Sequence, residues 1–282
     1  MISAFILIDK PAGITSFKAL SAIKKQFGTK RVGHAGTLDM SASGLIVAAA
    51  GKCTRLLPYI EAQEKVYSFD LHLGILTDTL EPTGNVLKRD DNAARTAEEI
   101  EAVLQSFVGE IEQVPPAFSA IKVNGKRASD LALKGKEVEL KARSVHIYCL
   151  NLDSLDLRIN RINGIDKVKI CCKCSKGTYV RSLARDIGER LGTCGAAGNI
   201  RRLAIGDISV ESASPEPVLP QELLGWEVAE IGEEQAKKIL NGVPVPHTLY
   251  PIPHAPVFIS SNGQIIAVAE YQNDYLVPKF LL

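Results

Sequence analysis

The stretch KVYSFDLHLG, residues 65–74, alternates apolar and polar side chains and decides the fold class of this 282-residue chain. Its apolar residues are Tyr67, Phe69, Leu71 and Leu73, and Ser68, Asp70 and His72 fall between them. A period of two is typical of a β-strand with one buried face and one face toward solvent. Such one-sided strands are found mainly in antiparallel sheets. The stretch therefore predicts a strand in a sheet that is covered on one side.

The segments on either side of that strand predict both helices and further strands. AFILID (4–9), SVHIYCLNL (144–152) and KVKICCKCS (167–175) have the composition of strands. TSFKALSAIKKQFG (15–28), TAEEIEAVLQSFVG (96–109) and TYVRSLARDIGERLG (178–192) have helical periodicity, and the second begins with the Thr-x-x-Glu spacing of a capping box. We therefore expect an α+β fold built on a mixed, largely antiparallel sheet with flanking helices.

Two segments interrupt this pattern and suggest how the chain is divided. SASPEPVLPQELLG (212–225) has three prolines within six positions and is typical of a linker between domains. We therefore predict one domain over residues 1–225 and a small β-rich domain over 226–282, with an Asn-Gly hairpin turn inside it. Within the first domain, residues 121–143 are basic and glycine-punctuated, which favours a mobile insertion that closes on an anionic partner.

Charge is distributed unevenly, although the net charge is only +1. Residues 1–202 hold 30 Lys and Arg against 22 Asp and Glu, whereas residues 203–282 hold 3 against 10. A basic body suits a polyanionic partner, and solvated surface lysines are the alternative. Scattered cysteines, the absence of signal-peptide features and apolar runs too short to cross a bilayer favour a cytoplasmic protein without a membrane anchor.

The segment GHAGTLDMSASG (33–44) gives up core-forming side chains for glycines, a histidine and one carboxylate, Asp39. It lacks the glycine and lysine spacing of phosphate-binding loops, and the chain has no Gly-x-Ser-x-Gly nucleophile motif. An Asx-turn or a helix cap is the structural alternative for Asp39. In the CCKC run, strand geometry sends Cys171 to the face opposite Cys172 and Cys174, which favours reduced thiols over zinc ligands.

Six segments together resemble the tRNA pseudouridine synthase B family, in the family's order and over about residues 5–210. They are DKPAGITS (9–16), GHAGTLDMSASG (33–44), KVYSFDLHLGILTDTLEPTG (65–84), VPPAFSAIKVNGKRA (114–128), CSKGTYVRSLARDIG (174–188) and CGAAGNIRRLAIG (194–206). The resemblance implies an enzyme that isomerises uridine to pseudouridine at position 55, in the T-loop of tRNA. It implies base flipping, an essential aspartate, and no guide RNA, cofactor or metal.

The same resemblance implies roles for individual residues. Asp39 matches the catalytic aspartate, and Arg181 matches the arginine that pairs with it; we expect a two-pronged contact between them. The substrate-binding positions are matched by His34, Tyr67, which stacks on the base, Tyr179, Ile200 at the pocket floor, and the supporting pair Lys10 and Pro11.

The chain departs from the family pattern at several positions. Met40, Ser41 and Ser43 replace residues of the usual Pro-Leu-Ala-Thr-Gly, Leu80-Glu81-Pro82 replaces an aspartate-bearing stretch, and Phe118 replaces a common tyrosine. Arg201 and Arg202 belong to the last of the six segments, and the structural alternative for both is an ordinary surface arginine. None of these departures removes a chemical group that the reaction needs.

The expected partner is the T-arm of tRNA, with no obligatory protein partner and a monomeric state. The C-terminal domain resembles a reduced PUA domain, but residues 226–282 offer three lysines against six carboxylates. We therefore expect that domain to add little to RNA affinity. Two other functions stay open: a guide-RNA-dependent pseudouridine synthase, and a non-catalytic RNA-binding protein that keeps the fold.

Overall fold

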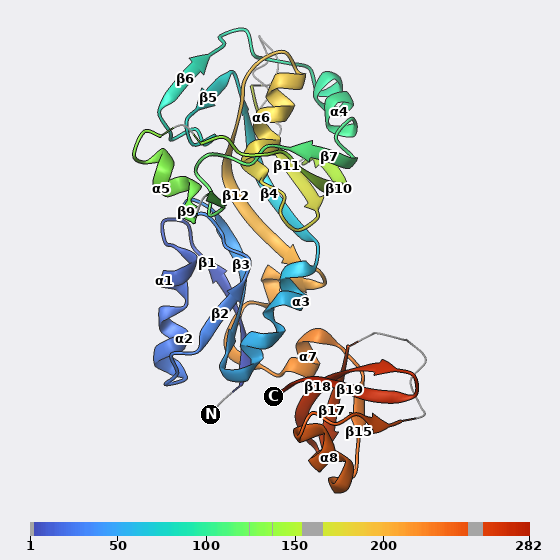
Figure 1. The fold of residues 1–282 in the computed structure, drawn as a ribbon. Coiled ribbons are helices and arrows are strands. Elements are labelled where there is room, and N and C mark those ends of the chain that lie inside the picture. Colours follow the sequence, from blue (N-terminus) through green and yellow to red (C-terminus); the bar gives the residue numbers. More distant parts are fainter. Residues whose placement is uncertain (1–2, 124, 137, 154–165, 248–255) are drawn as a thin grey trace.

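A computed structural model describes residues 3–123, 125–136, 138–153, 166–247 and 256–282 of the chain. Most of it is built on a ten-stranded sheet whose main path runs β14–β1–β3–β12–β4–β11–β10–β7, with β2 paired to β3 and β13 paired to β12 (Figure 1). The strands are β1 (Ala4–Lys10), β2 (Val32–Ala35), β3 (Ser43–Ala50), β4 (Lys65–Leu73), β7 (Gly109–Gln113), β10 (Arg143–Leu152), β11 (Lys167–Cys174), β12 (Gly195–Ile205), β13 (Ile208–Ser209) and β14 (Ser214–Val218).

Neighbouring strands of this sheet are antiparallel except β3 and β12. These two run parallel and share only two residue pairs, Ser43 with Arg201 and Gly44 with Arg202. The expected mixed, largely antiparallel sheet is therefore confirmed. The short parallel contact matters for the site, because it places the end of the 33–44 segment against the middle of β12.

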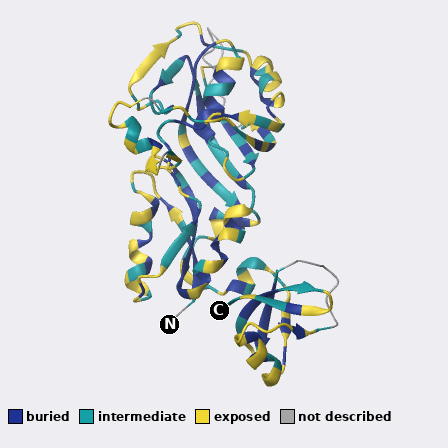
Figure 2. Ribbon diagram, in the orientation of Figure 1, coloured by how far each residue is buried: buried dark blue, intermediate teal, exposed yellow. Residues whose placement is uncertain are grey.

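The apolar face of β4 forms the centre of the core. Phe69 and Leu71 are fully buried and pack with residues of two helices, α4 (Ala97–Gln105) and α6 (Val180–Arg190). The predicted capping box of α4 is present, because the Glu99 amide donates to Thr96 Oγ1 at 3.2 Å and the Thr96 amide donates to Glu99 Oε2 at 2.8 Å. Figure 2 shows the resulting alternation of buried and more exposed residues along the central strands.

Two predictions about secondary structure need correction. Residues 15–28 form two short helices, α1 (Ser16–Ala19) and α2 (Ser21–Gln26), rather than one continuous helix. Residues 214–218, predicted to be linker, form the edge strand β14 against β1, followed by α7 (Pro220–Leu224). Proline lacks an amide donor but is tolerated on an edge strand, where one side of the strand needs no partner.

The C-terminal residues form a separate five-stranded sheet in the order β15–β17–β18–β19–β16. Its elements are β15 (Val228–Glu230), α8 (Glu233–Leu240), β16 (Val245–Pro246), β17 (Pro256–Ser261), β18 (Gln264–Gln272) and β19 (Tyr275–Leu281). Asn262 and Gly263 both have positive φ, at 52° and 73°, so the predicted Asn-Gly hairpin turn is confirmed. This β-rich unit is the small C-terminal part that the sequence predicts.

The two sheets meet at helix α3 (Leu57–Ala62), which follows the 3₁₀ helix η1 (Gly51–Leu56). Leu56 and Ile60 from this region belong to one hydrophobic cluster with Phe258 and Val268 of the C-terminal sheet. The residues before and after the predicted boundary at 225 and 226 therefore share a core.

The segment 121–143 forms a small hairpin, β8 (Lys122–Val123) and β9 (Lys126–Arg127), followed by α5 (Ala128–Ala132). The Ala128 amide donates to the Ile121 carbonyl at 2.7 Å, and Ala128 is fully buried. Part of this segment is thus regular structure, while residues 124 and 137 lie outside the described residues. A second small hairpin, β5 (Ile75–Thr77) with β6 (Val86–Arg89), lies between β4 and α4 in the chain. Among the described residues, no helix is long and apolar enough to cross a membrane.

Candidate active site

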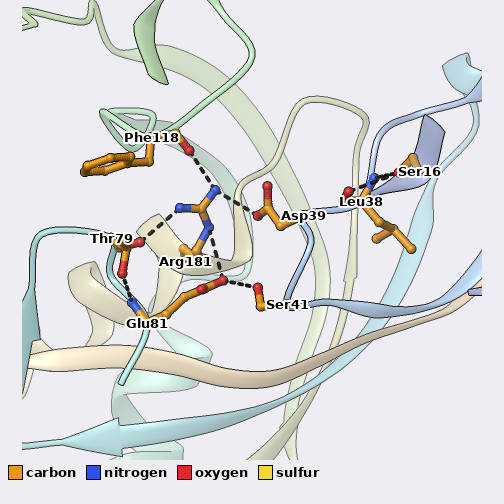
Figure 3. Close-up of polar contacts among 8 residues, drawn as sticks. All are labelled: Ser16, Leu38, Asp39, Ser41, Thr79, Glu81, Phe118 and Arg181. Carbon is orange, nitrogen blue, oxygen red and sulfur yellow. Dashed lines mark hydrogen bonds and ion pairs between the residues drawn. The ribbon is translucent and has the colours of Figure 1, made fainter. Parts of the chain in front are cut away.

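The loop that carries Asp39 is held by the N-terminal segment of the chain. The Ser16 hydroxyl donates to the Leu38 carbonyl at 3.0 Å and accepts from the Leu38 amide at 2.9 Å (Figure 3). The Gly13 amide donates to the Met40 carbonyl at 2.7 Å. The Asp39 loop leads into strand β3 rather than a helix, so Asp39 does not cap a helix. These bonds fix the backbone on both sides of a carboxylate whose side chain is 44% exposed.

Lys10 belongs to the same support and does not reach the cleft. Its side chain is fully buried, and Nζ donates to the Ile14 carbonyl at 2.8 Å and to the Pro11 carbonyl at 3.0 Å. Burial lowers the pKa of Lys10, and the nearby Asp39 carboxylate acts in the opposite direction. Pro11 is exposed and contributes its carbonyl. The Lys10 ammonium and the Pro11 carbonyl therefore stabilise the loop from behind, and their role toward the substrate stays a prediction.

Arg181 lies in the first turn of helix α6 and is the buried partner of Asp39. Its side chain is 5% exposed, and Nη2 lies 2.8 Å from Asp39 Oδ2. Nη1 donates to the Thr79 carbonyl and Nη2 to the Phe118 carbonyl, both at 2.9 Å (Figure 3). The expected two-pronged contact with Asp39 is wrong, because Nη1 is directed to the Thr79 carbonyl and the ion pair joins one nitrogen to one oxygen. The guanidinium therefore links the carboxylate to two distant loops.

Two of the positions that depart from the family pattern contact each other beside this arginine. Glu81 Oε1 lies 3.9 Å from Arg181 Nε and accepts a hydrogen bond from the Ser41 hydroxyl at 2.6 Å. Arg181 Nε has no hydrogen-bond partner among the described residues. A carboxylate is thus still present on the far side of Arg181, and Ser41 restrains it.

A cleft of about 690 Å³ opens next to Asp39 and Arg181. Of the eight residues predicted for the site, five line it: Asp39, Tyr67, Tyr179, Arg181 and Ile200. Its wall also carries cationic side chains that are not among the eight predicted site residues, namely Lys65, Arg143, Lys176 and Arg202, and one further carboxylate, Glu61. With Arg181 included, five cations face two carboxylates, so the cleft suits an anionic ligand.

Two tyrosines of the cleft, Tyr67 and Tyr179, are held by neighbouring strands and side chains. Tyr67 lies on β4 between Arg202 of β12 and Cys172 of β11. Burial raises the pKa of Tyr67, and the Arg202 guanidinium partly offsets this effect. The Tyr179 amide donates to Gln113 Oε1 at 2.8 Å, and Gln113 Nε2 donates to the Tyr179 carbonyl at 3.2 Å. The Arg143 guanidinium lies 4.8 Å from the centre of the Tyr179 ring.

His34 is not among the residues that line the cleft. It lies on β2 opposite Ala48, and its buried Nδ1 has no hydrogen-bond partner among the described residues. Burial lowers the pKa of His34, and the positive charge of Arg202 lowers it further. Both effects act against the protonated imidazole, and the charge of Glu61 acts in the opposite direction.

Arg202 is a structural residue of the site, so the alternative of a plain surface arginine is wrong for it. Only 1% of it is exposed; Nε donates to the Leu45 carbonyl at 2.7 Å and Nη2 to the Gly36 carbonyl at 3.1 Å. It thereby joins the two ends of the Asp39 loop. Arg201 points to the other side of the sheet, where it forms a bidentate pair with Asp9. Adjacent residues of a strand face opposite ways, so an Arg-Arg pair predicts one inward arginine.

Lys65 is the second buried cation that sequence reasoning missed. Its Nζ donates to the carbonyls of Glu61 and Gln63, at the end of α3. Burial lowers the pKa of Lys65 to about 8, assisted by the positive charge of Arg202. Among the described residues, no group of three or more His, Cys, Asp or Glu side chains is placed to hold a metal ion. The buried Cys172 and Cys174 are free thiols.

Comparison with known proteins gives this arrangement a family context. Residues 24–180 match the family model described as TruB family pseudouridylate synthase, N-terminal domain. A tRNA pseudouridine synthase B of Borreliella burgdorferi strain ZS7 is 39% identical over 250 residues, which are 86% of each chain. The protein of the same name from Borrelia garinii subsp. bavariensis is 36% identical over 277 residues, 96% of this chain and 95% of that one. A third, from Caulobacter sp. strain K31, is 40% identical over 75% of this chain and 66% of its own length.

Solved structures agree at the level of the fold. A Cbf5–Nop10–Gar1 complex contains a chain that superposes with a TM-score of 0.67 at 20% identity, covering 99% of this chain and 84% of that one. An H/ACA ribonucleoprotein bound to a substrate RNA containing 2′-deoxyuridine gives a TM-score of 0.68 at 17% identity, with the same coverage. Both alignments extend over nearly the whole chain, so the C-terminal sheet belongs to the shared fold.

Proposed function

Because this chain belongs to the TruB family of pseudouridylate synthases, we propose that it converts uridine to pseudouridine at position 55, in the T-loop of tRNA. The observation that carries the proposal is the Asp39–Arg181 ion pair at the wall of a cationic cleft that also holds Tyr67. The relatives that match most of the chain are named tRNA pseudouridine synthases, which supports tRNA as the substrate.

The reaction breaks the bond between C1′ and N1, turns the base and joins C1′ to C5. The hydrogen at C5 is released as a proton and N1 takes up a proton, so the product is an isomer of the substrate. Asp39 is the catalytic residue of this isomerisation, which needs no oxidant, reductant or nucleotide energy source. The adjacent guanidinium of Arg181 holds the Asp39 carboxylate by an ion pair at 2.8 Å. Asp39 is partly exposed and therefore meets the substrate. Arg181 is buried and holds the Asp39 carboxylate in place.

A uridine within a folded loop must leave its stack before a side chain can reach C1′. Tyr67 offers the face on which the extruded base stacks, and Ile200 closes the pocket floor. The cleft volume of about 690 Å³ accommodates a nucleotide with part of its backbone. Arg143 and Lys176 supply positive charge for the adjoining phosphates, which provide much of the affinity for RNA. The segment 121–143 then closes on the T-arm.

The experiment incubates the purified protein alone with an unmodified tRNA transcript and maps pseudouridine. Product at position 55, and none in a transcript with cytidine there, is expected. Modification only after addition of a guide RNA or another protein would favour the guide-dependent alternative. Tight tRNA binding without any product would favour the non-catalytic RNA-binding alternative. A monomer on size-exclusion chromatography is expected, because the proposed site is formed by one chain.

A further inference from the structure

The described part of the C-terminal sheet packs on the wall of the catalytic cleft through helix α3. Tyr59 of this helix contacts Trp226 edge-on, with ring centres 4.9 Å apart, and Trp226 in turn lies 5.1 Å from Phe258 of β17. Phe280 of β19 approaches Tyr59 from another side at 6.5 Å. The four rings form a continuous aromatic contact between the two sheets.

The end of the chain reinforces this contact with hydrogen bonds. Lys52 Nζ donates to the Leu282 carbonyl at 2.9 Å, and Arg55 Nη1 donates to the Leu281 carbonyl at 3.2 Å. Lys52 and Arg55 belong to η1, which leads directly into α3. The 3₁₀ helix that precedes α3 and the middle of α3 are therefore both held by the C-terminal part of the chain.

Other residues of α3 border the cleft that holds Asp39 and Arg181. Pro58, Glu61 and Ala62 line the cleft, and the carbonyl of Glu61 receives the buried ammonium of Lys65. Leu57 packs so closely on β2 that a Cβ at Gly33 would lie 2.8 Å from Leu57 Cδ1. Strand β2 continues through Gly36 into the Asp39 loop. A shift of α3 would thus reach the cleft wall, Lys65 and the start of the catalytic loop.

We propose that the C-terminal sheet acts as a positioning element for the active site, with Trp226 and Tyr59 as the positioning residues that hold α3 against the cleft. The charge of residues 226–282 supports this assignment, because three lysines against six carboxylates make a poor phosphate-binding surface. Neither Trp226 nor Tyr59 lines the cleft, so both act through α3. The activity measurement that tests this inference rests on the proposed function. The structural measurement depends only on the packing of α3.

The test compares Trp226→Ala in the full-length protein with two reference variants. Trp226→Phe keeps an aromatic ring at the contact. Tyr275→Ala removes an exposed aromatic ring from the same sheet, away from the aromatic contact. Amide hydrogen exchange is measured for Leu57 and for residues 59–62, with the amides of α4 as an internal reference. Single-turnover pseudouridine formation is measured on a full tRNA transcript and on an isolated T-arm hairpin.

Trp226→Ala should speed exchange in α3 and leave α4 unchanged. Its single-turnover rate should fall about ten- to hundred-fold, because small displacements of a catalytic constellation have effects of this size. The loss should be equal on the two RNAs, with tRNA affinity changed by less than about three-fold. Trp226→Phe should recover most of the rate, and Tyr275→Ala should behave as the wild type.

Wild-type exchange in α3 and a wild-type rate for Trp226→Ala would overturn the inference. A loss confined to full tRNA would also overturn it, because the sheet would then act by contacting RNA outside the T-arm. If Trp226→Ala fails to fold, Tyr59→Leu tests the same contact from the other side with the same readouts. Absence of product from the wild-type protein would instead reject the proposed function, while the exchange result for α3 would still decide the packing claim.

Discussion

Arg181→Lys keeps a positive charge at the site and removes the planar guanidinium that joins Asp39 to two backbone carbonyls. In the structure, Nη1 and Nη2 reach Thr79, Phe118 and Asp39 at 2.8–2.9 Å in three directions. A lysine ammonium has a single nitrogen and cannot occupy both positions. At least one of these charge-assisted bonds is lost, and each contributes about 1.5–3 kcal/mol.

If that loss is expressed in the transition state, the rate of pseudouridine formation falls about ten- to hundred-fold, at 1.36 kcal/mol for each factor of ten. The assay is single-turnover release of tritium from C5 of labelled uridine in a tRNA transcript, with enzyme in excess. Arg185→Lys is the matched control, because Arg185 lies one turn later on the same helix and bonds to Asp186 and the Val114 carbonyl instead. A rate for Arg181→Lys within about two-fold of wild type would refute the assigned role. An equal loss in Arg185→Lys would trace the effect to the helix rather than to the ion pair.

The remaining predictions concern charge, backbone and pH. Asp39→Asn keeps the shape of the side chain and should abolish product formation while tRNA affinity, measured by filter binding, is largely kept; residual activity of a few per cent would contradict the catalytic role. Gly44→Ala should lower the free energy of unfolding by about 2 kcal/mol in urea titrations, because Gly44 has φ of 104° and a Cβ there would lie 2.2 Å from the Arg202 carbonyl oxygen. Gly13→Ala is its control, with φ of 88° and open space around the new Cβ, and an equal cost in both would exclude the close approach as the cause. The pKa of Lys65 is about 8 in the folded protein, against 10.5 for the ordinary side chain. Between these two pH values the unfolded chain binds more protons than the folded one. The contribution of Lys65 to the free energy of unfolding therefore rises with pH through that window. The free energy of unfolding of the wild type, relative to that of Lys65→Met, should therefore be larger at about pH 9.5 than at about pH 7.5. The same difference at both pH values would contradict the buried ammonium. Limited proteolysis should cleave the segment 121–143 in the free protein and should be suppressed by tRNA, and equal cleavage with and without tRNA would count against its closing on the T-arm.

The parts of the fold that follow local rules could be predicted from the sequence. The alternation in residues 65–74 identified β4 and its buried face, and the Thr96–Glu99 spacing identified the start of α4, because both depend on residues close together in the chain. The prolines of the segment 214–218 predict a linker, because prolines are rare in strands. Its pairing with β1 depends on a partner more than 200 residues away, and no local signal reports that partner.

The candidate site, like the fold, could be predicted only in part from the sequence. Asp39, Tyr67, Tyr179, Arg181 and Ile200 share the cleft, as the family pattern predicts, whereas the two-pronged form of the Asp39–Arg181 contact does not occur. The difference arises because the Thr79 carbonyl, which belongs to the loop between β5 and β6, competes for Nη1. A sequence motif identifies which groups meet but not how many acceptors compete for one donor.

Arg202 shows most clearly what sequence reasoning lacked. Taken alone, an arginine is expected at the surface, because burying its charge without partners is costly. Here the parallel contact between β3 and β12 brings Gly44 against the Arg202 backbone, and only a residue without a side chain fits that approach. The same contact directs the guanidinium to the carbonyls of Leu45 and Gly36, on either side of Asp39. The glycine and the buried arginine are therefore one feature: the glycine lets two strands approach, and the arginine bonds the loop that this approach creates. The loop that holds Asp39 thus depends on a residue more than 150 positions away, and the order of the motifs along the chain does not reveal that dependence.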